Sequence, residues 1–135
     1  MNLIFTYLCG GINGLNAAQA KNWREVAKSL LKTDTLDPMR RDYRGIEDAS
    51  VNEIVKGDLE DIQNSRFILV NATRPSWGTA MEIVYAYMTG DSRIVSFTEG
   101  AKISPWLRYH SDAVYNTVEE AIDDINIAIS VKDAA

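Results

Sequence analysis

Glu82 is the residue whose position in this chain points most directly to chemistry. It lies early in a predicted helix at 78–88, which follows an apolar run at 66–72. The positive end of a helix dipole favours a carboxylate near the helix start. A carboxylate in a partly dry pocket can act as a nucleophile toward an anomeric carbon or as a general base. Acids are also common in first turns, so a solvated or ion-paired Glu82 is the alternative from its position alone.

Three further side chains offer protons or hydrogen bonds. Asp58 and Asp61 in "KGDLED" (56–61) are either solvent-facing charges, or one of them tips into a pocket as an acid that protonates a leaving base. Tyr7 lies in the first apolar run, where a tyrosine is normally a core residue. Because a buried hydroxyl needs a hydrogen-bond partner, Tyr7 is also a candidate to orient a catalytic carboxylate.

The turn "CGGINGLN" (9–16) is a candidate binding loop. Bare backbone at Gly10 and Gly11 permits close approach of a phosphate or a flat ligand. A tight turn from strand to helix is an equally good explanation of the two glycines. The segment is neither the G-x-G-x-x-G dinucleotide fingerprint nor a P-loop, since no Lys follows.

An arginine cluster lies in "DPMRRDYRG" (37–45). Arg40, Arg41 and Arg44 either clamp an anionic group or form ion pairs with the acids beside them. The single histidine, His110, has no metal-like companions and is expected to be structural or superficial. The sequence indicates neither a metal site nor a cofactor.

An alternation of strands and helices must position these residues. Apolar runs rich in β-branched residues predict strands, and apolar residues at helical spacing predict helices. The predicted strands are 3–9, 33–38, 66–72, 93–98 and 113–116, and the predicted helices are 16–32, 51–65, 78–88 and 117–130. We expect N-caps at Asn16, at Ser50 in a capping box with Glu53, and at Thr117.

This order predicts an α/β fold with a mainly parallel sheet between two helical layers. In such folds the ligand binds outside the carboxyl ends of the strands. The segments that follow the strands are 10–13, 37–38, 71–78 and 98–104. The site is therefore expected among them.

Composition sets broad limits on function. The 135 residues fit one domain, 1–135, with 46% hydrophobic and 24% charged residues. A net charge of −5 argues against binding a nucleic-acid backbone. No apolar run approaches the ~20 residues of a membrane helix, so we expect no membrane partner. The single cysteine, Cys9, fits a reducing compartment, and we expect a cytoplasmic protein.

Taken together, five segments resemble the nucleoside 2-deoxyribosyltransferase family. They are "YLCGGING", "DPMRRDYRG", "GDLEDIQNSRFILVN", "PSWGTAMEI" and the tail "SPWLRYHSDAVYNTVEEAI". The resemblance extends over nearly the whole chain, and the order and spacing of the segments carry it. It implies a flavodoxin-like three-layer sandwich with a five-stranded, mainly parallel sheet.

The resemblance also implies a reaction. Glu82 matches the family's nucleophile, which attacks C1′ of a 2′-deoxyribonucleoside, expels the base and passes the sugar to another base or to water. Asp58 matches the acid that contacts the base, and Tyr7 matches the tyrosine that hydrogen-bonds the nucleophile. The residues expected to bind substrate are Gly10, Gly11, Ile12, Asn13, Arg40, Arg44, Asn71, Ser76, Trp77, Gly78, Ser111 and Asn116.

The chain departs from the family pattern at one position. Trp77 stands where the transferases carry a second base-contacting aspartate, and it could stack on a base. Ser76 matches a serine that binds phosphate in relatives that hydrolyse deoxynucleoside 5′-monophosphates. Family members complete their sites from a neighbouring subunit, which implies a homo-oligomer with Ser111 and Asn116 as candidate contributors.

Several functions therefore stay open at this point. The leading interpretation is a nucleoside 2-deoxyribosyltransferase that takes a nucleoside and a free nucleobase as its small-molecule partners. An N-glycoside hydrolase of (deoxy)nucleoside 5′-monophosphates is the first alternative, and a non-catalytic nucleotide-binding protein is the second, because a fold does not fix a function. An oligomeric scaffold is disfavoured, since it has no need for Glu82 or Asn71 at strand ends.

Overall fold

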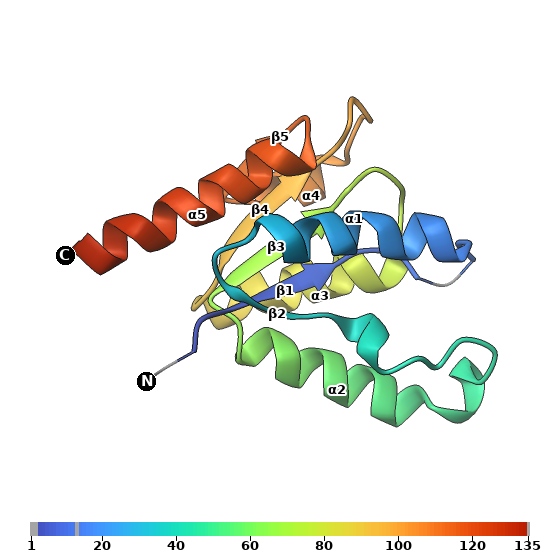
Figure 1. Cartoon of the computed structure of the whole chain (residues 1–135). Helices are drawn as coiled ribbons and strands as arrows, with labels where there is room; N and C mark the ends of the chain where they lie inside the picture. The colour runs from blue at the N-terminus through green and yellow to red at the C-terminus, as the bar shows by residue number, and fades with distance from the viewer. Residues whose placement is uncertain (1–2, 13, 135) are drawn as a thin grey trace.

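A computed structural model of the chain describes residues 3–12 and 14–134 and shows a parallel sheet between two layers of helices (Figure 1). The strands are β1 (Phe5–Cys9), β2 (Asp34–Leu36), β3 (Phe67–Asn71), β4 (Arg93–Phe97) and β5 (Ala113–Tyr115). The helices are α1 (Ala17–Leu30), α2 (Val51–Gln63), α3 (Trp77–Thr89), α4 (Pro105–Tyr109) and α5 (Val118–Ala134). The five-stranded sheet has the order β2-β1-β3-β4-β5, with parallel pairing throughout. The predicted α/β sandwich is confirmed.

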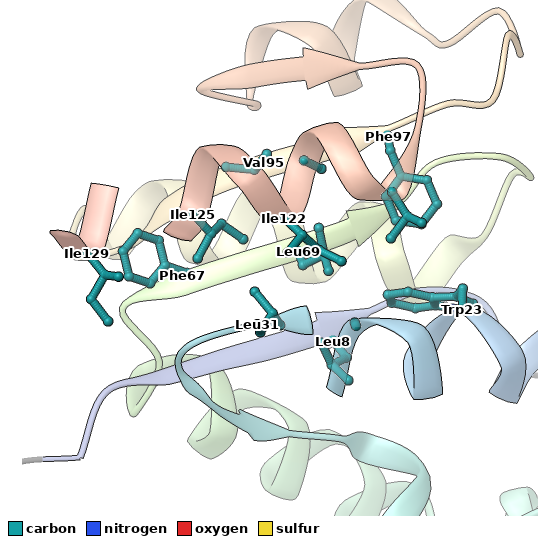
Figure 2. Packing of buried hydrophobic residues seen from close by; sticks show 13 residues of the cluster. Leu8, Trp23, Leu31, Phe67, Leu69, Val95, Phe97, Ile122, Ile125 and Ile129 are labelled. Carbon is teal, nitrogen blue, oxygen red and sulfur yellow. The ribbon is translucent and has the colours of Figure 1, made fainter. Parts of the chain in front are cut away.

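The sheet is buried on both faces, and its central strands are mostly apolar, with Thr6 of β1 and Ser96 of β4 buried among them. On one face, Leu8 of β1 packs with Trp23 of α1 and with Ile122 and Ile125 of α5 (Figure 2). On the other face, Tyr7 and Cys9 of β1 pack with α2 and α3, in a cluster that includes Ile62, Ile83 and Ala86. Side chains alternate between the two faces of a strand. β1 therefore directs Tyr7 toward the α2–α3 layer.

Most of the predicted boundaries agree with the structure. Asn16 caps α1 in a capping box with Gln19. The Thr117 hydroxyl accepts the N–H of Glu120 at the start of α5, while Glu120 accepts the N–H of Thr117. Ser76 caps α3, since its hydroxyl accepts the N–H of Thr79. This cap fixes where the chain turns from β3 into α3.

Two details differ from the sequence prediction. Ser50 precedes α2, but its side chain makes no capping hydrogen bond, so the predicted capping box with Glu53 is wrong. The reason is a short 3-10 turn, Glu47–Ala49, whose last bond uses the Ser50 N–H and leads directly into the helix. The helix α4, capped by Ser104, was not predicted because five residues are too few to show a period.

Among the described residues, no helix is long and apolar enough to cross a membrane.

Candidate active site

A cavity of about 350 Å³ lies at the carboxyl edge of the sheet. Its walls come from the turn after β1, the segment after β2, one side of α2, the segment after β3 and the first turns of α3. The predicted site residues that line it are Gly10, Gly11, Ile12, Arg44, Asp58, Asn71, Ser76, Trp77, Gly78 and Glu82. The chain therefore brings most of the predicted site together from segments far apart in sequence.

Glu82 lines the cavity, whereas Tyr7 is buried, does not line it and acts on the site through Glu82. The Tyr7 hydroxyl donates a hydrogen bond to Oε2 of Glu82. Glu82 points back along α3, so that its Oε1 lies 3.9 Å from the place where a Cβ on Gly78 would be. Helical side chains lean toward the helix N-terminus, which brings the carboxyl group near the positive end of the α3 dipole.

The charge state of this pair is set mainly by burial. Burial raises the pKa of Glu82 from 4.5 to about 8; the hydrogen bond from Tyr7 opposes the rise, and the charge of Asp58 adds to it. Burial and the nearby Glu82 also raise the pKa of Tyr7, so its hydroxyl stays protonated and can donate. Glu82 is thus a carboxyl group poised to ionise near neutral pH, as a catalytic base or nucleophile should be.

Asp58 of α2 is another acid that lines the cavity, together with Glu47 and with Asp42, which pairs with Arg44. Burial raises the pKa of Asp58 to about 6, while the guanidinium of Arg41 opposes the rise. Arg41 Nη2 lies 3.6 Å from Asp58 Oδ1 and 2.8 Å from Asp61 Oδ2. Of the two predicted acids, Asp58 therefore faces the cavity, whereas Asp61 is a buried partner for arginines.

The predicted arginines occupy different places. Arg40 makes a bidentate pair with Asp61, at 2.7 and 2.8 Å, and does not line the cavity. Arg44 does line the cavity, and its guanidinium is paired with Asp42. The structure places Arg41 there as well, on the wall beside Asp58.

The turn after β1 is held by a buried arginine that sequence reasoning missed. Arg24 of α1, whose side chain is 0% exposed, donates from Nη2 to the carbonyls of Gly10 (3.0 Å) and Leu8 (3.3 Å). Its Nε lies 3.5 Å from Asp37 Oδ1, just after β2. Arg24 lies one turn after the buried Ala20, and a charged residue on an apolar helix face was the available signal.

Gly10 is required by close packing at the same point. A Cβ there would lie 2.8 Å from the Trp23 ring and 3.1 Å from the Cβ of Asn71. Distances this short exclude a side chain without movement of the neighbours. The first glycine of the turn therefore lets the ends of β1 and β3 approach α1, and Arg24 fixes the carbonyl beside it.

The remaining predicted residues lie around or away from the cavity. Asn71 accepts hydrogen bonds from the N–H and hydroxyl of Thr73, which shapes the turn after β3. Ser111 is bonded to Ser96 and to the Leu107 carbonyl, and neither Ser111 nor Asn116 lines the cavity. Asn13 lies outside the described residues. His110 stacks on the ring of Trp106.

No protein-family model and no curated protein matches the chain, but solved structures do. A 2-deoxyribosyltransferase from the bacterium Bacillus psychrosaccharolyticus superposes with a TM-score of 0.67 at 20% identity, covering 87% of this chain and 90% of that one. This chain has the fold of that enzyme. A CMP N-glycosidase from Clostridium botulinum superposes with a TM-score of 0.61, also at 20% identity, covering 90% and 98%.

The two enzymes are those that the sequence resemblance led us to expect, a transferase and a nucleotide N-glycosidase. At this identity the likeness concerns the fold. What this chain does must be argued from its own cavity.

Proposed function

We propose that the protein is a nucleoside 2-deoxyribosyltransferase. The observation that carries the proposal is that two of the acids lining one cavity have different environments: Glu82 is hydrogen-bonded to the Tyr7 phenol, and Asp58 lies beside the Arg41 guanidinium. Pairs of titratable groups with separated roles are typical of glycosyl transfer. The exposed Trp77 at the cavity edge offers a face on which a base can stack.

In the proposed reaction, Glu82 attacks C1′ of a 2′-deoxyribonucleoside and forms a C1′–O bond. The C1′–N bond breaks, its electron pair stays on the base, and Asp58 gives that base a proton. Tyr7 orients the attacking carboxylate through its hydrogen bond. In the second half, an incoming base displaces Glu82, and Asp58 takes the proton that this base loses.

A hydrolase of (deoxy)nucleoside 5′-monophosphates is the second candidate, and one observation favours it. Ser76 lies at the amino end of α3, with its hydroxyl oxygen 3.8 Å from where a Cβ of Gly11 would be. A hydroxyl, a helix N-terminus and a bare glycine turn together suit a phosphate. Water would then take the place of the acceptor base.

Product analysis separates these candidates. Deoxynucleosides and their 5′-monophosphates are incubated with the protein, with and without a second free base, and the products are resolved by chromatography. A new nucleoside that forms only with the second base supports the transferase. Free base from a monophosphate without acceptor supports the hydrolase, and no turnover of either class would leave a nucleotide-binding protein.

The pH profile is expected to be bell-shaped. Between pH about 6 and about 8 the pair Glu82–Asp58 holds one proton, which lies mostly on Glu82 because its pKa is the higher. The reactive form is the minor one, with that proton on Asp58 and Glu82 ionised. kcat/KM should therefore decrease at pH values below the lower pKa and at pH values above the higher pKa. Tyr7→Phe removes a bond that lowers the pKa of Glu82, so the upper limb should move to higher pH and kcat/KM should fall about 10-fold or more.

Steady-state rates from pH 5 to 10 for wild type and Tyr7→Phe test this expectation. An upper limb that stays in place in the variant would show that the tyrosine does not act through Glu82. Thermal melting of both proteins provides the control for folding.

We extend the proposal to a homo-oligomer in the cytoplasm. Exposed apolar side chains follow one stripe of α3 at helical spacing, with Trp77 86%, Met81 66% and Met88 76% exposed, and Trp106 of α4 is exposed as well. Such patches mark interaction sites, and Trp77 makes this one continuous with the cavity. Sedimentation of the wild-type chain tests the extension, and a monomer at assay concentration would contradict it.

A further inference from the structure

Arg41 packs into the wall of the cavity at a defined position. Its guanidinium lies flat against α2 at Gly57, where a Cβ would meet Nε and Nη2 at 3.0 Å and Cζ at 3.1 Å. Glycine inside a helix is less stable than alanine. Here the missing side chain is what admits the guanidinium next to Asp58.

The charge of Asp61, the acid that Arg41 contacts most closely, is already paired with another arginine. Asp61 receives two hydrogen bonds from Arg40, at 2.7 and 2.8 Å, before Arg41 adds a third at 2.8 Å. A guanidinium has five N–H donors in a fixed fork. Arg41 is 27% exposed and lines the cavity, so it can present donors to a ligand while it remains bound to Asp61.

The pair therefore offers a defined pattern to a leaving base. Whatever its resting state, Asp58 must carry a proton when it protonates that base, so it acts as a donor. Arg41 is a donor in every state. Two donors lie side by side, with Arg41 Nη2 and Asp58 Oδ1 only 3.6 Å apart.

We propose that Arg41 and Asp58 together select nucleobases whose edge presents two adjacent acceptors. The inference rests on the proposed glycosyl transfer, in which Asp58 is the acid. Among purines, a 6-oxo base such as hypoxanthine or guanine presents N7 and O6. Adenine instead places an amino donor beside N7, and that donor would face the guanidinium.

The same chemistry separates the pyrimidines. Cytosine presents the acceptors O2 and N3 next to each other, whereas uracil and thymine carry an N–H at position 3. A donor facing a donor leaves both without a partner in a partly dry site, which is costly. Arg41 is thus assigned as a specificity-determining residue for the base.

Two substrate pairs test the inference, deoxyinosine against deoxyadenosine and deoxycytidine against deoxyuridine, each as nucleoside and as 5′-monophosphate. In wild type, kcat/KM should favour the first member of at least one pair by about 10- to 100-fold. A preference in the purine pair alone or the pyrimidine pair alone identifies which base the cavity accepts. Equal values within both pairs overturn the inference.

Variants test whether Arg41 is the cause of this base preference. Arg41→Met should bring the ratio close to one, mainly by slowing the preferred substrate. Gly57→Ala keeps the charge but moves the guanidinium, so the ratio should fall while the helix is not weakened. Arg66→Met, an exposed arginine before β3, is the matched control and should keep the wild-type ratio. An unchanged ratio in both Arg41→Met and Gly57→Ala overturns the assignment.

Calorimetric binding of the free bases at pH 5, where Asp58 carries a proton without any reaction, keeps this test separate from the reaction. Hypoxanthine against adenine, and cytosine against uracil, should show the same order and the same loss in Arg41→Met. If the protein shows no turnover but keeps this order, the base selection stands and the proposed transferase fails. If the protein turns over substrate but binds the two bases of each pair equally, the transferase stands and the base selection fails.

Discussion

Glu82→Gln is expected to lower turnover by about 10⁴-fold or more, the size of effect seen when an enzyme loses its nucleophile. The amide keeps the size of the side chain and can still accept the Tyr7 hydrogen bond, but it cannot attack C1′. Activity is measured by chromatography of released base. Glu60→Gln on the exposed side of α2 is the matched control and should keep wild-type activity.

Glu82→Gln is also expected to increase the stability of the fold at high pH, although it lowers activity. The pKa of Glu82 in the folded protein, about 8, lies above its usual 4.5, because ionisation of a buried carboxyl group is unfavourable. The stabilisation contributed by the protonated Glu82 is therefore complete below about pH 4.5 and is lost as the pH rises through about 8. Glu82→Gln does not ionise, so it should be more stable than wild type at pH 9 by at least about 1 kcal/mol, and equal to it near pH 4.

Urea unfolding at the two pH values measures this difference. A variant that is inactive and less stable at pH 9 would mean that Glu82 supports the fold rather than the chemistry. A variant that is stable and retains more than about a tenth of the activity would remove Glu82 from the role of nucleophile.

Arg24→Met is expected to destabilise the fold by about 3 kcal/mol or more. The substitution leaves the buried carbonyls of Leu8 and Gly10 without their donor, and it removes one of the two cations beside Asp37. Methionine fills much of the same volume, so the loss should come from polar groups rather than from a void. Urea unfolding at pH 7 gives the free energy.

Lys28→Met is the matched control for Arg24→Met. Lys28 contacts the same carboxylate, at 2.7 Å from Asp37 Oδ2, but its side chain is 36% exposed. Pairs that reach solvent contribute little, so its removal should cost no more than about 1 kcal/mol. Similar losses for the two variants would contradict the view that the buried hydrogen bonds of Arg24 hold the turn.

Those parts of the fold that depend on a strong local pattern could be predicted from the sequence. Within the run at 66–72, residues 67–70 are apolar without interruption, and they form most of the central strand β3. Asn16 and Thr117 stand where a helical period begins, and both cap their helices. Parallel order then follows, because alternating strands and helices need crossovers, and the order places the strand-end segments at one edge.

What could not be predicted depends on contacts between segments that are distant in sequence. Nothing in "DPMRRDYRG" tells Arg40 from Arg41; the difference arises because Gly57 on α2 admits only one of the two guanidinium groups. Ser50 is a different case, because the 3-10 turn directly before it uses its N–H and displaces the capping pattern that the sequence shows. Local patterns alone do not decide such positions, because packing and neighbouring turns also act on them.

The order of the elements along the chain has a consequence for synthesis. The described residues that line the cavity all lie between Gly10 and Glu82, whereas β4, β5 and α5 come later. During synthesis every one of these residues is therefore made before β4. At that stage β3, which is apolar on both faces, still has one edge unpaired. An open apolar strand edge is a template for aggregation. The nascent chain is therefore most exposed to aggregation after the site is complete in sequence and before residues 93–97 pair with β3.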